Sequence, residues 1–354
     1  MREMRIPRVA MVFAGCFLGA GYVSGQELWQ FFGAFGPAGL AGLAIAMGIL
    51  ALFGILTFRT AQITGRTLFD EVVIGWDAPV LKTLMSALEN LLMFGVVAVM
   101  AAGVGALFQQ MLNLPGWLGC LVFSAVVLAF ALFGLQAVAS AFSVTVPLLV
   151  AATVLVCIVS IRENGLCLPP PSVQSHALLG NFAVGAVNFA CYNMFLSIAI
   201  LAPFVAFIPR RSTVYCGVGL GTVLLAVLAM GVLVTLSGLP EAVEAELPML
   251  FAAARLTSFG GWLYAAMLAL AMFGTALSSF VGISHYFTER WTLWKHHPKL
   301  CAAGLCLLAF GASLFGFGDL ISVLYPLYGY GSIVFLVIFL IRFIKLKMNS
   351  KKPA

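Results

Sequence analysis

Three glycines and three polar side chains interrupt an apolar stretch near the start of the chain. They lie within the segment 18–28, LGAGYVSGQEL, and are Gly19, Gly21, Gly25, Ser24, Gln26 and Glu27. Glycine tolerates backbone conformations that end a helix. A broken helix exposes carbonyl groups that attract cations and amide groups that attract anions. This segment therefore predicts a helix break that binds a small polar or charged solute, although glycines at this spacing also serve close helix packing.

Glu27 is the acidic residue of this segment, and few roles suit a carboxylate within an apolar span. If the second half-helix begins beside it, the helix dipole favours its negative charge. The carboxylate could bind a substrate ammonium group, carry a proton or cap the half-helix, and the sequence leaves these three roles open. We expect the neighbouring Gln26 to form hydrogen bonds in the wall of the site.

A second group of polar residues lies in the apolar stretch 188–197, NFACYNMFLS. Its candidate binding residues are Asn188, Cys191, Tyr192 and Asn193. Together with the first segment they give a predicted substrate site at Gly21, Val23, Ser24, Gly25, Gln26, Glu27, Asn188, Cys191, Tyr192 and Asn193. Its walls are not strongly charged, which favours a small neutral amino acid over a highly charged solute.

Three hydroxyl residues share one helical face in the stretch MFGTALSSFVG. Thr275, Ser278 and Ser279 follow i, i+3, i+4 spacing. Hydroxyl and carbonyl oxygens are the ligands that a small hard cation prefers. The alternative is that these hydroxyls bond to their own helix. Glu89, in SALENLLMFG, is a candidate gating or proton-carrying group, or a carboxylate paired with a cytoplasmic arginine.

The composition requires a membrane protein. Hydrophobic residues make up 63% of the 354 residues and charged residues 8%, which far exceeds the needs of a soluble core. We found no HExxH, GxSxG or paired intramembrane aspartates, so we do not expect an enzyme. The eight cysteines show no metal-ligand spacing and are expected to be small buried side chains without an organic cofactor.

Hydropathy predicts ten transmembrane helices. Their ranges are 8–35, 38–58, 81–112, 117–137, 140–161, 178–207, 212–237, 259–287, 300–317 and 319–345. With both termini cytoplasmic, all 18 lysines and arginines except Arg162 and Arg255 lie inside, as the positive-inside rule requires. The positive charge therefore reflects topology in a bacterial inner membrane rather than a nucleic-acid partner.

Five spans on each side of a proline-rich external loop would make two halves of opposite orientation. The first half is 1–162, the loop 163–177, the second half 178–347 and a basic cytoplasmic tail 348–354. The two polar segments then occupy the first span of each half. Interrupted helices at matching positions of inverted halves indicate a transporter site near the membrane midplane. We therefore expect an all-α fold in which spans one and six are both interrupted.

The segment GAGYVSGQE resembles the first helix of the amino acid–polyamine–cation transporter superfamily. More narrowly, it is similar to the YkvI-type bacterial membrane proteins. The resemblance implies the five-plus-five inverted repeat of the LeuT fold. It also implies a sodium ion held by Gly19 and Tyr22 carbonyls, a Thr275 carbonyl, and the Ser278 and Ser279 hydroxyls. A lysine that replaces the ion in proton-coupled relatives is absent from span five, which favours sodium.

These observations together predict a sodium-coupled secondary transporter of a small amino acid or related amine. Its expected partners are that solute and the lipid bilayer, and its oligomeric state is open. The alternatives are a proton-coupled transporter that uses Glu27 or Glu89, and a membrane sensor without transport.

Overall fold

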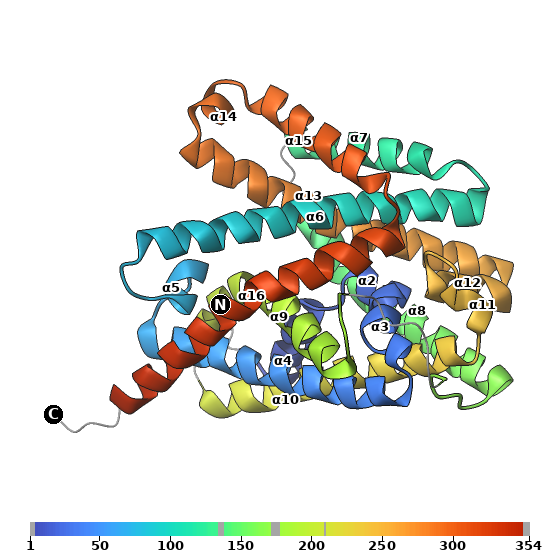
Figure 1. Ribbon diagram of the computed structural model, residues 1–354, viewed down its shortest axis with the longest axis horizontal. Helices are drawn as coiled ribbons and strands as arrows, with labels where there is room; N and C mark the ends of the chain where they lie inside the picture. The colour runs from blue at the N-terminus through green and yellow to red at the C-terminus, as the bar shows by residue number, and fades with distance from the viewer. Residues whose placement is uncertain (1–3, 134–137, 171–177, 209, 350–354) are drawn as a thin grey trace.

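The chain folds into long helices that pack roughly in two layers (Figure 1). The computed structural model describes residues 4–133, 138–170, 178–208 and 210–349. Within these ranges the regular structure is helical. Seven helices are long and apolar enough to cross a membrane. They are, or lie within, α4 (Pro37–Thr64), α6 (Pro79–Leu112), α8 (Val138–Asn164), α9 with η2 (Phe182–Leu201 and Ala202–Phe207), α10 (Arg211–Ser237), α13 (Ser258–Arg290) and α16 (Phe317–Asn349).

Three shorter apolar helices coincide with the remaining predicted spans. They are α1 (Ile6–Gly15), α7 (Gly116–Phe133) and α15 (Pro298–Ser313). Large apolar side chains remain exposed along several helices, such as Val227, which is 66% exposed, and Leu307, which is 67% exposed. Exposed apolar side chains on long helices are what a lipid environment requires.

Prolines begin several of these helices. Pro37, Pro79 and Pro298 occupy the first turns of α4, α6 and α15. An amide at this position has no partner inside the helix, so proline costs no hydrogen bond there and its fixed φ suits the helix. The chain can therefore turn sharply between spans without leaving unpaired amides in the membrane.

The helices form two groups. In one, α6 packs along α13, and both contact α7 and α15; this group lies at the top of Figure 1. In the other, α4 packs against α9 and α10, and α1 lies along α10. The long α16 contacts both α6 and α9, and thus joins the two groups.

Span one is broken, as the sequence predicts. After α1 the chain leaves helical structure over residues 16–19, and it continues as the short helices α2 (Ala20–Ser24) and α3 (Gln26–Phe31). Gly25 separates these two helices with φ of 84°, a left-handed conformation that favours glycine. The chain then passes through η1 (Gly33–Phe35) to α4.

Span six is not broken where we expected, and this prediction was wrong. The helix α9 runs without interruption through Asn188 and Ser197 and changes to the 3-10 helix η2 only at Ala202. No glycine or proline lies between Ala186 and Leu201, and the polar side chains bond back to the helix: Asn193 donates to the Phe189 carbonyl at 3.1 Å. The transition coincides with Pro203, which lacks an amide to continue the α-helical pattern.

The segment 238–258 is not one continuous helix. It contains two helices, α11 (Pro240–Val243) and α12 (Pro248–Leu256). Pro248 begins the second helix instead of interrupting one, in keeping with the preference of proline for the first turn. The small helices α5 (Phe69–Val73) and α14 (Thr292–His296) lie near the opposite end of the molecule (Figure 1).

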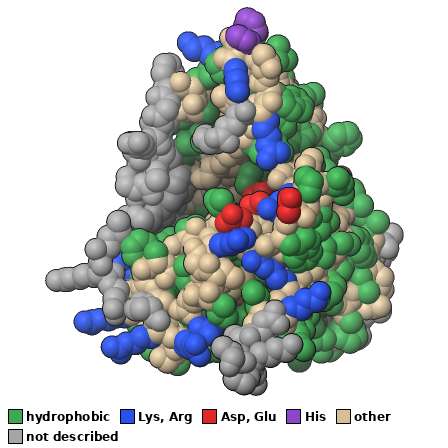
Figure 2. Space-filling model, turned by 90° about the vertical axis from the view of Figure 1, so that its left-hand side faces the viewer, with side chains coloured by type: hydrophobic (Ala, Val, Ile, Leu, Met, Phe, Trp, Pro, Cys, Tyr) green, Lys and Arg blue, Asp and Glu red, His purple; other side chains and the backbone are tan. Residues whose placement is uncertain are grey.

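Many basic residues lie at that opposite end. Figure 2 shows Lys and Arg side chains spread over this face, with a small group of acidic side chains near its centre. The chain start is attached here as well, because the Met4 amide donates to the Phe207 carbonyl at 2.9 Å. The N-terminal end of α1 is therefore bound to the last residue of η2.

Candidate functional site

Glu27 lies inside the protein and touches the sixth span. It occupies the first turn of α3, directly after the break at Gly25, and is 5% exposed. The hydroxyl of Tyr192 donates a short hydrogen bond to Glu27 Oε1, and Asn193 Nδ2 lies 3.3 Å from the same oxygen. The structure thus brings together three of the residues that the sequence marked in two separate segments.

These contacts bear on the three roles left open for Glu27. Its carboxylate accepts no recorded hydrogen bond from the amides of α3, whose start has no side-chain cap. It is instead oriented by side chains of α9, so the helix-capping role is not supported. A buried carboxylate held by a hydroxyl and an amide retains lone pairs for a further donor.

Aromatic rings pack around Tyr192, whose hydroxyl binds this carboxylate. The ring of Tyr192 lies 4.9 Å from that of Tyr325 and 5.7 Å from that of Phe31, centroid to centroid. The Phe189 ring lies 5.6 Å from the Phe31 ring. Ring faces attract cations, and the attraction grows when water is excluded. A carboxylate among aromatic rings is therefore suited to an ammonium group.

Gly21 makes room for Glu27. A side-chain carbon added at Gly21 would lie 2.6 Å from Glu27 Oε2, well inside van der Waals distance. The structure therefore gives this glycine a packing role against the carboxylate. The Ser24 hydroxyl donates to the Gly21 carbonyl at 2.9 Å and is completely buried.

Tyrosine hydroxyls join α2 to two other helices, α13 and α10. Tyr264 of α13 donates to the Val23 carbonyl at 2.6 Å, and its hydroxyl lies 3.0 Å from that of Thr153 on α8. Tyr22 itself points away from the break, and its hydroxyl donates to the Leu225 carbonyl of α10 at 2.7 Å. Tyr264 was not among the residues predicted from the sequence. The available signal was a tyrosine in an apolar span, because a buried hydroxyl needs a partner.

Asn188 and Cys191 lie elsewhere on α9. Asn188 donates to the Pro326 carbonyl of α16 at 2.8 Å, and its buried Oδ1 has no partner among the described residues. Cys191 is buried and reduced. These two residues connect the sixth span with its surroundings, and no recorded contact joins them to Glu27.

The predicted sodium ligands are distributed over two helices. Gly19 precedes α2 and has open space where a side chain would stand. On α13, the Thr275 hydroxyl donates to the Ala271 carbonyl at 3.0 Å, while Ser279 is half-buried and Ser278 exposed. The recorded hydrogen bond between α13 and span one comes from Tyr264 rather than from these hydroxyls. The sodium site therefore stays a prediction.

One end of the site is covered by the segment that contains α11 and α12. Glu246 Oε2 accepts a hydrogen bond of 2.7 Å from the Gly318 amide at the start of α16. Beside it lies a hollow of about 250 Å³ whose lining includes the predicted wall residue Gln26 and Asp319. A side chain added at Gly25 would meet Met249 at 3.0 Å, so α12 closes directly over the break.

The other end of the broken segment is more open. Gly15 is exposed, and a side-chain carbon at Gly15 or Gly19 would meet no atom within 4 Å. The backbone at Gly15 and Gly19 therefore borders open space. The break has one covered side and one accessible side.

Glu89 lies on α6, separate from Glu27. It is half-buried and close enough to Asp70 for the two carboxylates to act on each other electrostatically. Asp70 forms an ion pair with Lys82 at 3.2 Å. Among the described residues Glu89 forms no ion pair, so the alternative of an arginine partner is not seen in this part of the chain.

Two Bacillus subtilis (strain 168) proteins are similar to this chain over nearly their whole length. The uncharacterized membrane protein YkvI is 25% identical over 93% of both chains. The uncharacterized protein YyaD is 27% identical, covering 94% of this chain and 95% of its own. No protein-family model matches the sequence. The resemblance to YkvI-type membrane proteins is thereby confirmed.

Solved structures show the same fold. MhsT in complex with L-phenylalanine matches with a TM-score of 0.63 at 16% identity, covering 96% of this chain and 89% of its own. The inward facing conformation of Mhp1 matches with a TM-score of 0.58 at 14% identity, covering 95% and 75%. A manganese transporter mutant of Eremococcus coleocola matches with 0.54 at 15% identity, covering 94% and 78%. The chain has the LeuT fold, and these similarities agree with the expectation that it is not an enzyme.

Proposed function

We propose that this chain, which has the LeuT fold and resembles YkvI-type membrane proteins, is a secondary active transporter of a small amino acid or related amine. The observation that carries the proposal is the meeting of Glu27 with Tyr192 and Asn193 beside a broken helix. Broken helices in transporters mark the place where substrate and coupling ion bind. The covered end and the more open end suit a site that is exposed to one side at a time.

The proposed architecture is ten crossings in two inverted halves of five. Corresponding spans pack against each other: α4 with α10, α6 with α13, and α7 with α15. This pairing is what an internal two-fold relation between the halves would produce. We place both termini in the cytoplasm of a bacterium, with the basic face of Figure 2 on the cytoplasmic side of the inner membrane.

The site chemistry supports an amine substrate. Glu27 offers a buried negative charge, and the rings of Phe31, Tyr192 and Tyr325 offer faces that attract an ammonium group. The first turn of α3 offers amides without acceptors inside the helix, which suit a substrate carboxylate. Among the described residues no group of His, Cys, Asp and Glu could hold a metal ion, so manganese is disfavoured as cargo. The L-phenylalanine bound by MhsT is consistent with an amino acid.

The proposed coupling ion is sodium, bound by Gly19 and Tyr22 carbonyls together with Thr275, Ser278 and Ser279. The open space beside Gly19 and the half-buried position of Ser279 are compatible with it. The test is uptake into proteoliposomes with and without a sodium gradient. Ser279→Ala should reduce sodium-driven uptake, whereas Ser258→Ala, at the exposed start of the same helix, should not. Equal uptake with and without a sodium gradient would exclude sodium coupling.

A proton-coupled transporter is the second candidate. It is favoured by Glu89, which is half-buried and lacks an ion pair within the described part of the chain. Acidification of the vesicle interior during uptake, abolished by Glu89→Gln, would support it over sodium coupling. No change of internal pH during sodium-driven uptake would rule it out.

The substrate is best identified by thermal stability. A ligand that binds the folded state raises the melting temperature by mass action. Purified protein would be screened against amino acids and amines, first in sodium and then in potassium. A shift that requires both a particular amine and sodium would identify cargo and ion together. If no amino acid or amine changes the melting temperature in either salt, the proposed substrate class is incorrect.

A further inference from the structure

A groove of about 1200 Å³ opens between α4, α10 and α16, away from the Glu27 site. Its walls are mostly apolar and face outward: Leu52 is 47% exposed, Ile344 49% and Tyr215 50%. Such side chains in a membrane protein contact lipid tails. The residues of the lining that carry a charge at neutral pH are all basic, namely Arg59, Arg211 and Lys347.

Arg59 is the decisive residue of the groove. It is 8% exposed, and its recorded hydrogen bond goes to the Gln62 side chain at 2.6 Å. Gln62 is in turn fixed by donating to the Ile208 carbonyl at 2.6 Å. The ion pairs found among the described residues do not include Arg59. A buried guanidinium without a carboxylate is costly and calls for an anion from outside the chain.

The start of α10 adds to this positive site. Arg211 is the first residue of α10, and no side chain caps the preceding position. The first amides of a helix carry partial positive charge and lack acceptors inside it. Arg211 is exposed and lines the same groove as Arg59, so two guanidinium groups and a helix start border this groove.

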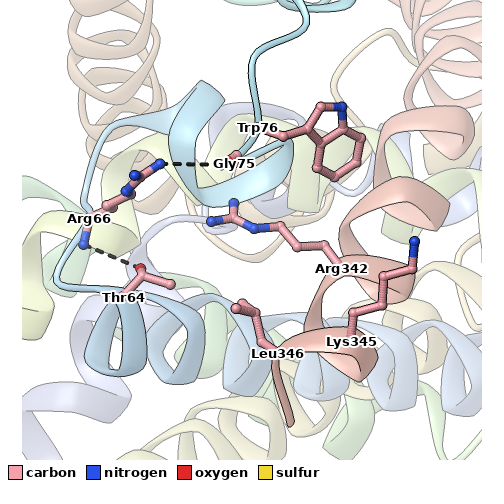
Figure 3. Close-up of a pocket in the computed structure, with 7 residues that line it drawn as sticks. All are labelled: Thr64, Arg66, Gly75, Trp76, Arg342, Lys345 and Leu346. Atoms are coloured by element: carbon pink, nitrogen blue, oxygen red, sulfur yellow. Dashed lines mark hydrogen bonds between the residues drawn. The ribbon is translucent and has the colours of Figure 1, made fainter. Parts of the chain in front are cut away.

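The neighbouring basic hollow differs in a way that makes the groove the better candidate. On the other side of α16, a hollow of about 510 Å³ is lined by Arg66, Trp76, Arg342 and Lys345, among others (Figure 3). There Arg342 donates a short hydrogen bond to the Glu71 carbonyl, and Arg66 donates to the Gly75 carbonyl at 3.3 Å. Those guanidinium groups hold the chain around α5 in place. Within the described part of the chain, Arg59 has no such backbone acceptor.

From this arrangement we propose that the groove binds an anionic glycerophospholipid of the cytoplasmic leaflet. Its phosphate would lie on Arg59 and Arg211, and one acyl chain would follow Leu52, Ile55 and Leu56 along α4. Arg59 lies seven positions beyond Leu52, about 10 Å along a helix, which matches a lipid whose charged head lies at the interface and whose tail runs inward. The apolar length of the groove favours a lipid over a free phosphate. The inference is independent of the transported solute.

The test is selective stabilisation by lipid. Purified protein in a neutral detergent would be titrated with phosphatidylglycerol, phosphatidylcholine or inorganic phosphate, and its melting temperature followed. We expect phosphatidylglycerol to stabilise the protein more than phosphatidylcholine. Arg211→Gln should weaken the apparent affinity about fivefold, and Arg59→Gln roughly tenfold or more because its charge is buried. Arg66→Gln, an exposed arginine at the end of α4 outside this lining, should have little effect.

Further measurements keep the outcome unambiguous. Arg59→Lys retains the charge and should keep most of the selectivity; the melting temperature of each variant in phosphatidylcholine shows whether it is folded. Equal stabilisation by the two lipids, equal losses in Arg59→Gln and Arg66→Gln, or full stabilisation by inorganic phosphate would each overturn the proposal. A working transporter without lipid selectivity would refute this inference alone.

Discussion

The two walls of the Glu27 site are built in different ways. The first span contributes an interrupted helix, which is non-helical over residues 16–19 and has a left-handed glycine at position 25. The sixth span contributes an unbroken helix whose side chains, Tyr192 and Asn193, reach across to Glu27. One wall therefore offers peptide groups and the other offers side chains. In this arrangement one broken helix is enough, because the unbroken helix on the other side supplies polar side chains of its own.

The substitution Glu27→Gln removes the charge that both walls surround, and it should have the largest effect. We expect uptake to fall by about 30-fold or more, because an ammonium group bound in a buried site loses its charged partner. The melting temperature without substrate should stay the same or rise, since removing a buried charge relieves its desolvation cost. Uptake and thermal melting of purified protein measure both effects. Glu163→Gln, an exposed carboxylate at the end of α8, is the matched control. Normal uptake by Glu27→Gln would show that the carboxylate is not a substrate ligand.

The broken wall is tested by Gly25→Ala. A side chain at φ of 84° is strained, and it would also meet Leu236 at 2.9 Å. We expect a loss of about 1–3 kcal/mol in stability, measured as a lower melting temperature. Gly48→Ala, where a side chain meets no atom within 4 Å, should be neutral or slightly stabilising. Equal melting temperatures for the two variants would contradict the role given to Gly25.

The side-chain wall is tested by Tyr192→Phe. This change keeps the ring beside Tyr325 and removes only the hydroxyl that holds Glu27. Hydrogen bonds to charged groups contribute about 1.5–3 kcal/mol, so substrate affinity should fall roughly tenfold. Tyr22→Phe removes a hydroxyl that binds Leu225 instead and serves as the comparison. If the two variants bind substrate equally well, Tyr192 does not orient the carboxylate.

The smallest expected effect is at the segment that contains α11 and α12, which covers one end of the site. Glu246→Gln weakens the charge-assisted bond to the Gly318 amide but preserves an acceptor. We expect the cover to open more often and a cysteine placed at Gln26 to react a few-fold faster with an external thiol reagent. Exposed Glu244→Gln provides the control. An unchanged labelling rate would mean that this bond does not help to hold the cover closed.

The sequence predicted the broken wall better than the continuous one. Gly25 and Glu27 were identified because local conformation and the cost of a buried charge are properties of single residues. The break in span six was predicted wrongly from polarity, although the lack of glycine and proline between Ala186 and Leu201 argued for an unbroken helix. Contacts between distant segments, such as Tyr264 with the Val23 carbonyl, depend on packing that no local pattern reveals.

The hydrogen bond from the Met4 amide to the Phe207 carbonyl has a mechanical consequence. A displacement of the N-terminal end of α1 must either break this bond or move η2 with it. In the second case α1 and η2 would move together as one rigid unit, with the non-helical residues 16–19 as the hinge. Such a movement would then be a joint displacement of both spans rather than the bending of one.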